Sequence, residues 1–188
     1  MSLVFLTGPV RGGKSGAAER LAQERGGPVV IAVAGWDGDE EMERRIEAHR
    51  STRPADWVTI AATPEDDWVA RVPTDSTLVL DCLGTLVATA CHEAIGDAEV
   101  APAGAVSEVE ERLRALVAAL VHRTGDSVIV SNETGWGVVP AWPGARLFRD
   151  ELGRANRRLT DAADAAYLVI DGRFLDLRAL PARAVWPQ

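Results

Sequence analysis

The stretch from Gly8 to Ser15 constrains the fold of this chain more than any other. Its residues, Gly-Pro-Val-Arg-Gly-Gly-Lys-Ser, match G-x-x-x-x-G-K-[ST], the phosphate-binding loop. An apolar run at 3–7 precedes the loop, and a run suited to a helix follows at 16–22. A strand, a glycine-rich turn and a helix form the context in which this loop works. Backbone N–H groups and the helix N-terminus then point at phosphate oxygens.

Individual residues of this loop have expected roles on a bound nucleotide. Lys14 would reach the β- and γ-phosphates, and the Ser15 hydroxyl would ligate Mg²⁺. Asp81 ends the apolar run 77–81 and has the type and position of the acid that holds Mg²⁺ opposite such a loop. The same carboxylate would alternatively cap the helix expected after it, and the two roles can coexist. The residues expected to bind phosphate are Gly8, Pro9, Val10, Arg11, Gly12, Gly13, Lys14 and Ser15.

Apolar runs typical of buried strands alternate with helical patterns along most of the chain. Strands are expected at 3–7, 28–34, 57–60, 77–81, 127–131, 166–170 and 174–177, and helices at 16–22, 37–50, from 64–68, 83–95, from 106, and 145–163. Repeated β-α units indicate a mainly parallel sheet with helices on both faces. We therefore expect one nucleotide-binding domain over 1–188, a phosphate-loop NTPase-type α/β/α fold in three layers, with a C-terminal hairpin turning at Asp171-Gly172. Ligands of such sheets bind beyond the carboxyl ends of the strands.

Charge and cysteine content narrow the class of partner. The net charge of −8 argues against broad electrostatic binding to nucleic acid or to an anionic membrane. Two cysteines, Cys82 and Cys91, are too few for a disulfide framework and indicate a reducing compartment. No apolar run approaches the ~18 residues of a membrane span, so we expect a cytoplasmic protein without stable membrane insertion.

His49 is the histidine for which a catalytic role is hardest to decide. On the expected helix 37–50 it shares a face with Met42 and Ile46, which is usual for a core histidine. Arg50 and Arg53 follow it, and a histidine beside two guanidinium groups near a triphosphate can attack phosphorus. The arginines would alternatively complement the helix dipole. The residues alone leave both interpretations open.

The other histidines and the tryptophans have simpler expectations. His92 and His122 stand at apparent helix ends, where capping or surface roles are usual. Trp57 and Trp68 are expected in the core. Trp136 and Trp142 belong to a glycine-rich loop that would cover a large ligand.

A series of motifs occurs in a fixed order along nearly the whole chain. After the phosphate loop come the segment 42–50 with Arg53-Pro54 and Trp57, then Leu80-Asp81-Cys82, the loop 131–140, Arg146, Phe148-Arg149-Asp150, Gly153, Asn156 and Ala163-Asp164. The loop reads Asn-Glu-x-Gly-x-Gly-x-Val-Pro from Asn132 and is the most specific of them. In this order the motifs resemble the bifunctional adenosylcobinamide kinase/adenosylcobinamide-phosphate guanylyltransferases of cobalamin biosynthesis.

The resemblance implies two reactions at or near one nucleotide site. ATP or GTP first phosphorylates a hydroxyl of the corrinoid adenosylcobinamide. GTP then transfers GMP to a histidine, matched here by His49, releasing pyrophosphate, and the phosphorylated corrinoid takes the GMP. The resemblance also implies nucleotide contacts at Val33, Ala34, Gly35, Arg50, Ser51, Thr52, Arg53 and Asp81, a substrate side with Asn132, Glu133, Arg149 and Asn156, Mg²⁺ as cofactor, and a homotrimer.

The chain departs from the family pattern at two positions. Ala61 stands where Trp-x-Thr-x-Glu places a carboxylate, which predicts weaker discrimination of guanine from adenine. Asp81 stands where the family acid is often the longer Glu. Neither change removes the phosphate loop or His49.

Three other functional classes fit parts of the sequence. A small-molecule kinase without guanylyltransferase activity needs Lys14 and Mg²⁺ but not His49. A regulatory GTPase would use Asp81-Cys82-Leu83-Gly84 as D-x-x-G, but it also expects Asn-Lys-x-Asp, which does not occur. A partner-binding module without catalysis would not require Lys14-Ser15 together with Asp81. We rank the bifunctional enzyme first and the kinase second.

Overall fold

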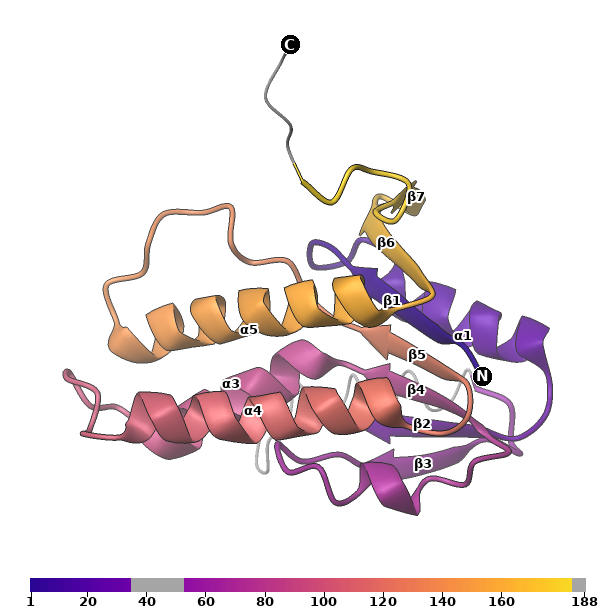
Figure 1. Ribbon diagram of the computed structural model, residues 1–188, viewed down its shortest axis with the longest axis horizontal. Helices are drawn as coiled ribbons and strands as arrows, with labels where there is room; N and C mark the ends of the chain where they lie inside the picture. The colour runs from indigo at the N-terminus through magenta and orange to yellow at the C-terminus, as the bar shows by residue number, and fades with distance from the viewer. Residues whose placement is uncertain (35–52, 184–188) are drawn as a thin grey trace, which may run out of the picture.

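The computed structural model describes residues 1–34 and 53–183, and the helix expected at 37–50 lies outside them. The described strands form one sheet in the order β3-β2-β4-β5-β1-β6-β7 (Figure 1). Their bounds are β1 Leu3–Thr7, β2 Val29–Val33, β3 Val58–Ala61, β4 Thr77–Asp81, β5 Ser127–Val130, β6 Ala165–Ile170 and β7 Arg173–Asp176. All neighbouring pairs are parallel except β6 and β7, which are antiparallel.

Helices cover both faces of this sheet, as the β-α repeats predict. The described helices are α1 Lys14–Arg25, α3 Leu83–Ile95, α4 Ala105–His122 and α5 Pro143–Ala162. α3, α4 and α5 pack together on one face, while α1 lies on the other (Figure 1). The strand side chains alternate between the two layers, as a pleated strand requires. In β4, for example, Leu78 and Leu80 join the core under α3, α4 and α5, whereas Val79 joins the core under α1.

The region from residue 64 to 72 differs from the expectation of a helix. Only one 3₁₀ turn forms there, η1 Val69–Arg71. The Trp68 ring is 2% exposed, and its indole N–H donates to the Thr63 carbonyl, so the segment is fixed by burying one ring rather than by a helical stripe. Pro73 follows at once, and a residue before proline is disfavoured in helical conformation.

The predicted C-terminal hairpin is present. Ile170 pairs with Arg173 across a two-residue turn in which Asp171 and Gly172 both have positive φ, 49° and 73°. Positive φ at both central positions is the geometry that suits the twist of a hairpin. The last parallel strand, β6, lies beside β1. The hairpin turn after β6 therefore lies at the same carboxyl edge of the sheet as the start of the phosphate loop.

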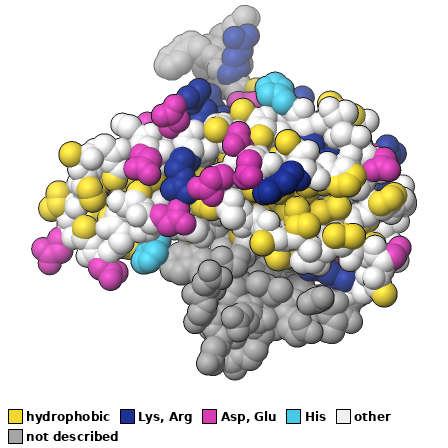
Figure 2. All heavy atoms as spheres, turned by 90° about the horizontal axis from the view of Figure 1, so that it is seen from below, with side chains coloured by type: hydrophobic (Ala, Val, Ile, Leu, Met, Phe, Trp, Pro, Cys, Tyr) yellow, Lys and Arg dark blue, Asp and Glu magenta, His cyan; other side chains and the backbone are white. Residues whose placement is uncertain are grey.

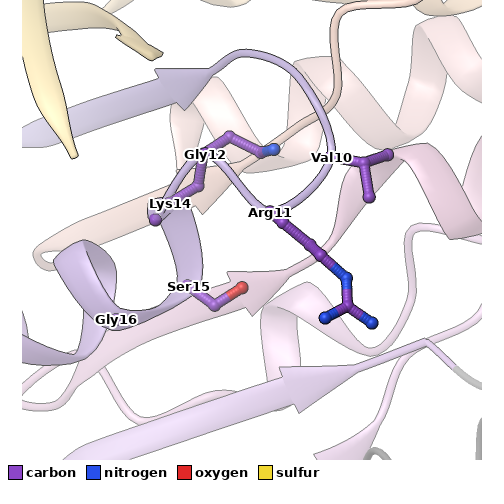
Figure 3. A pocket seen from close by; sticks show the side chains of 7 residues that line it. Val10, Arg11, Gly12, Lys14, Ser15 and Gly16 are labelled. Carbon is purple, nitrogen blue, oxygen red and sulfur yellow. The ribbon is translucent and has the colours of Figure 1, made fainter. Parts of the chain in front are cut away.

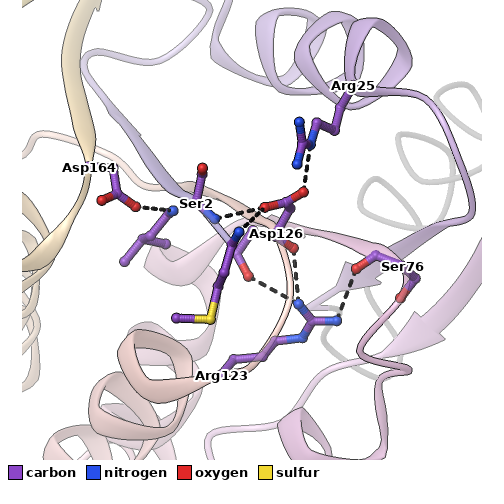
Figure 4. A network of polar contacts seen from close by, with 9 residues as sticks. Ser2, Arg25, Ser76, Arg123, Asp126 and Asp164 are labelled. Atoms are coloured by element: carbon purple, nitrogen blue, oxygen red, sulfur yellow. Dashed lines mark hydrogen bonds and ion pairs between the residues drawn. The ribbon is translucent and has the colours of Figure 1, made fainter.

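The amino edge of the sheet is held by a polar network (Figure 4). The Asp126 carboxylate accepts hydrogen bonds from the Ser2 backbone N–H at 2.7 Å and from Arg25 Nε at 2.6 Å. Arg123 donates to the carbonyls of Pro73, Ser76 and Asp126, and it is 7% exposed. The network therefore ties together the segments that enter β1, β4 and β5, on the edge away from the phosphate loop.

The remaining expectations concern individual side chains. Trp68 is buried and Trp57 is half-buried against the core beside α1. His92 and His122 are exposed in the last turns of α3 and α4, as predicted. None of the described helices is long and apolar enough to span a membrane. Figure 2 shows acidic and basic side chains interspersed over one face rather than gathered into a basic patch.

Candidate active site at the carboxyl edge of the sheet

The phosphate loop joins β1 to α1 and opens into a cavity of about 450 Å³ lined by residues 10–16 (Figure 3). α1 begins at Lys14, and its N-cap residue, Gly13, has φ 97° and no capping side chain. The first N–H groups of a helix have no partner within the helix, so here they are directed at whatever the loop holds. An anion suits this position, because the helix dipole adds to the N–H groups.

Tight packing behind the loop explains two of its glycines. A Cβ on Gly8 would lie 2.2 Å from the Val169 carbonyl oxygen, and a Cβ on Gly12 would lie 2.8 Å from the same atom. The Gly172 backbone N–H donates to the Gly12 carbonyl at 3.0 Å. The β6–β7 hairpin thus forms the back wall of the phosphate loop.

Lys14 is held by the loop itself. Its Nζ donates to the carbonyl oxygens of Gly8 at 2.9 Å and Pro9 at 2.7 Å, and the residue is 6% exposed. Burial lowers the pKa of the Lys14 ammonium, while Cys82 and Asp81 nearby act to raise it. The two carbonyl contacts fix the amine at the loop, where it can meet a phosphate without first being ordered.

Ser15 and Asp81 meet across the sheet edge. The Ser15 hydroxyl donates to Asp81 Oδ1 at 3.1 Å, although the residues are 66 positions apart. Asp81 is the last residue of β4, and α3 begins two residues later with Cys82 at its N-cap, so the alternative of Asp81 as the N-cap residue is wrong.

A hydroxyl and a carboxylate in contact are oxygen ligands of the type that Mg²⁺ takes in nucleotide sites. Within residues 1–34 and 53–183 no group of three or more His, Cys, Asp or Glu side chains could hold a metal ion. Protein sites usually bind Mg²⁺ through one or two carboxylates together with substrate phosphates and water.

The loop after β5 carries the predicted substrate-side residues Asn132 and Glu133. The Glu133 backbone N–H donates to the Gly8 carbonyl at 3.0 Å, and its side chain accepts from the Gly135 N–H at 2.8 Å. Asn132 Nδ2 lies 3.7 Å from Cys82 Sγ. Asn156, on α5, is buried and bonds to this loop from behind, at the Asn132 carbonyl.

Further along, the same loop presents apolar side chains to solvent. Two arginines of α5 hold its backbone: Arg149 donates to the Gly137 carbonyl at 3.4 Å, and Arg146 donates to those of Pro140 and Ala141. These arginines of α5 bind the loop through its backbone carbonyls, and several apolar side chains of the loop remain exposed to solvent. The exposed ones are Trp136 at 77%, Val138 at 95%, Val139 at 63% and Trp142 at 42%.

The residues expected around the base of the nucleotide are only partly described. Val33 ends β2 and pairs with Asp81 on one side and Ala61 on the other, with Ala34 buried just beyond. Gly35, His49, Arg50, Ser51 and Thr52 lie outside the described residues.

Arg53 is almost fully buried. Its side chain is 4% exposed, its Nε donates to Glu19 Oε1 at 2.8 Å, and its Nη1 has no hydrogen-bond partner in the described part of the chain. Glu19 lies one helical turn after Ser15 on α1. No motif singled out Glu19 in the sequence, because only the tertiary fold brings it to Arg53.

Comparison with known proteins identifies the family. The family model described as cobinamide kinase / cobinamide phosphate guanyltransferase matches residues 4–177. The chain belongs to this family. The bifunctional adenosylcobalamin biosynthesis protein CobU of Salmonella typhimurium is 34% identical over 90% of this chain and 96% of its own length. The bifunctional adenosylcobalamin biosynthesis protein CobP of Pseudomonas aeruginosa is 32% identical over 94% of this chain and 98% of its own length.

A solved structure shares the fold. A protein of Pyrococcus horikoshii OT3 superimposes with a TM-score of 0.50, covering 93% of this chain and 85% of that one at 8% identity. At this identity the likeness supports the α/β arrangement alone. The cobinamide kinase/guanylyltransferase family membership supplies the functional information.

Proposed function

We propose that this chain is a bifunctional enzyme that phosphorylates adenosylcobinamide and then attaches GMP to the phosphorylated product. The observation that carries the kinase half is the contact of Ser15 with Asp81 beside the anchored Lys14. Three elements, the phosphate loop, α1 and β4, converge there on the groups that phosphoryl transfer uses. Membership of the cobinamide kinase/guanylyltransferase family supports the second half.

In the kinase reaction the corrinoid hydroxyl oxygen bonds to the γ-phosphorus of ATP or GTP, and the bond to the β–γ bridging oxygen breaks. Lys14 and the N–H groups of the loop balance the charge on the phosphates. Ser15 and Asp81 would hold Mg²⁺, which supplies additional positive charge on the same oxygens when bound.

In the guanylyltransferase reaction we assign the nucleophile to His49 from its match to the family motif. A neutral imidazole nitrogen bonds to the α-phosphorus of GTP, and pyrophosphate leaves. A phosphate oxygen of the phosphorylated corrinoid then attacks the same phosphorus, the P–N bond breaks, and the histidine is regenerated.

We assign the corrinoid side to residues 132–142 of the loop after β5. Its exposed tryptophans and valines offer the apolar surface that a large macrocycle would cover, and Glu133 ties the loop to the phosphate loop. The homotrimer implied by the resemblance and the cytoplasmic location expected from the sequence are part of this proposal. Light scattering of the purified chain tests the former.

Labelling with α-³²P-GTP tests the function. The wild-type chain should acquire acid-labile, base-stable protein-bound label, the behaviour of a P–N bond. His49→Ala and His49→Asn should lose the label and guanylyl transfer but keep most corrinoid phosphorylation. Lys14→Ala should lose about 10²–10³ in both rates, because one preorganised charge contact is removed. Acid-labile GMP on His49→Ala would overturn the assignment of His49. If neither the wild-type chain nor any variant acquires label, only the kinase activity remains.

A further inference from the structure

The strand order places the end of β5 between the two halves of the nucleotide site. β5 pairs with β1, which leads into the phosphate loop, and with β4, which ends at Asp81. Residues that follow β5 therefore emerge between Lys14 on one side and Asp81 on the other. Asn132 is the second residue after β5.

The Asn132 side chain is directed along this gap toward the start of α3. Its Nδ2 lies 3.7 Å from Cys82 Sγ, and a Cβ on Gly84 would come within 2.9 Å of the same nitrogen. Gly84 thus leaves room for the amide, which rests over the first turn of α3 next to Cys82. Cys82 directly follows Asp81, whose carboxylate contacts Ser15. The Asn132 amide is therefore a neighbour of the groups that hold phosphate and metal.

A buried amide behind Asn132 fixes it in this place. Asn156 is 7% exposed, and its Nδ2 donates to the Asn132 carbonyl at 2.9 Å. Its Oδ1 accepts from the Ser131 hydroxyl at 2.6 Å, and its Nδ2 also lies 3.5 Å from Thr7 Oγ1. One side chain of α5 thus ties the residue after β5 to the last residue of β1. Its polar atoms are used within the protein, so it does not reach a substrate in this arrangement.

We propose that Asn132 is a catalytic residue of the kinase reaction, and that Asn156 is a positioning residue that acts through it. The proposal rests on the proposed function. The Asn132 amide hydrogen-bonds the terminal phosphoryl group while the corrinoid hydroxyl oxygen bonds to phosphorus and the β–γ bridging oxygen departs. An amide takes up no proton at neutral pH, so the hydroxyl proton leaves to a phosphate oxygen or to water, and Asn132 contributes orientation and a hydrogen bond.

Replacing Asn132 should affect corrinoid phosphorylation and enzyme guanylylation differently. Asn132→Ala should lower kcat of corrinoid phosphorylation by about 10²–10³, as for other single donors aimed at a transition state, with little change in KM for the nucleotide. Labelling of the enzyme by α-³²P-GTP should change less than threefold, because that step occurs at the α-phosphorus. Wild-type kinase activity in the same assay separates a failure of this proposal from a failure of the proposed function.

Asn156 has a matched pair of variants. Asn156→Asp keeps the acceptor for Ser131 and loses the donor to the Asn132 carbonyl, so it should lower kcat at least tenfold. Ser131→Ala removes the hydroxyl that donates to Asn156 Oδ1. It should lower the thermal midpoint of unfolding, while kcat stays within threefold. If Asn156 serves only the packing of α5, both variants will lower the midpoint and neither will lower kcat.

A double-mutant cycle decides whether Asn156 acts through Asn132. Residues that act as one unit are strongly non-additive, so Asn132→Ala combined with Asn156→Asp should be no slower than Asn132→Ala alone. Additive losses would overturn the positioning role. If Asn156→Asp does not fold, unchanged kcat in Asn132→Ala still overturns the proposal, because that side chain is half-buried and lies at the edge of the site.

Discussion

Near the phosphate loop, Arg53 and Glu19 form a largely buried ion pair that no sequence motif indicates. Arg53 enters the fold with its guanidinium almost fully buried, and Glu19 is its ion-pair partner on α1. A buried charge is stable only when it is paired, and removing one partner leaves the other uncompensated. Because Glu19 stands one turn after Ser15, the pair fixes the chain just before β3 against the phosphate-loop helix.

Glu19→Gln should therefore destabilise the protein by about 1–3 kcal/mol, the range for a hydrogen bond to a charged group left without its partner. The chain segment that ends at Arg53 contains His49, so enzyme guanylylation should fall more than corrinoid phosphorylation. Urea unfolding and the two activity assays measure these effects. Glu24→Gln, on the exposed side of the same helix, is the control and should change neither. Equal losses in the two reactions would argue against a specific link to His49.

One carboxylate, that of Asp126, ties together several segments at the amino edge of the sheet. Asp126 precedes β5 and contacts the start of β1 and the end of α1. The hydrogen bond from Arg25 and the Ser2 N–H lower the pKa of the Asp126 carboxyl, against the opposing effect of burial. The carboxylate side chain is 19% exposed, so this charge is only partly screened by solvent.

The lowered pKa of Asp126 gives stability a pH dependence of known sign. Between its folded pKa and the ordinary value of 3.8, the unfolded chain binds more protons than the folded one, so stability rises with pH. The contribution is complete above 3.8 and is lost as the pH falls through the folded pKa. Asp126→Asn should be less stable at pH 7, and its stability should fall less steeply as the pH drops below 3.8 in urea titrations. Asp67→Asn, which removes an exposed ion pair with Arg71, should leave the slope unchanged.

At the scale of the whole molecule, the two ends of the described chain build one site. The hairpin formed by β6 and β7 supports the loop that follows β1, through the Val169 carbonyl and the Gly172 N–H. The corrinoid-side loop is joined to the same Gly8 through Glu133. We therefore expect nucleotide binding to depend on packing between segments more than 120 residues apart.

Gly12→Ala tests this dependence without forcing alanine into a positive φ, because Gly12 is not among the positive-φ residues. The added Cβ would lie 2.8 Å from the Val169 carbonyl, so the hairpin must move away from the loop. We expect overpacking to cost roughly 1–3 kcal/mol and nucleotide affinity to fall at least tenfold. Gly153→Ala on α5 is the matched control, because its Cβ meets nothing within 4 Å. There alanine should stabilise by about 0.5–1 kcal/mol. Calorimetric unfolding and nucleotide titration measure both, and an unchanged affinity in Gly12→Ala would refute the role of the hairpin.

Features that depend on local pattern could be predicted from the sequence alone. The spacing of Gly8, Gly13, Lys14 and Ser15 specifies a phosphate loop, and the continuous apolar runs specify a parallel sheet, because both signals lie within a few residues of each other. The hairpin turn at Asp171-Gly172 is local for the same reason. The expectation of a helix near Pro64 was wrong, because burial of the Trp68 ring overrode a weak start signal.

Which side chains contact one another depends on the packing of the whole fold. That Ser15 contacts Asp81, that Arg53 pairs with Glu19, and that Asn156 is a buried tie behind Asn132 all follow from the strand order β4-β5-β1 and the packing of α1 and α5 against it. These contacts join residues 24 to 66 positions apart. Whether a segment forms a strand or a helix depends mainly on residues close to it in the sequence. A contact between residues far apart in the sequence forms only after several elements have packed together.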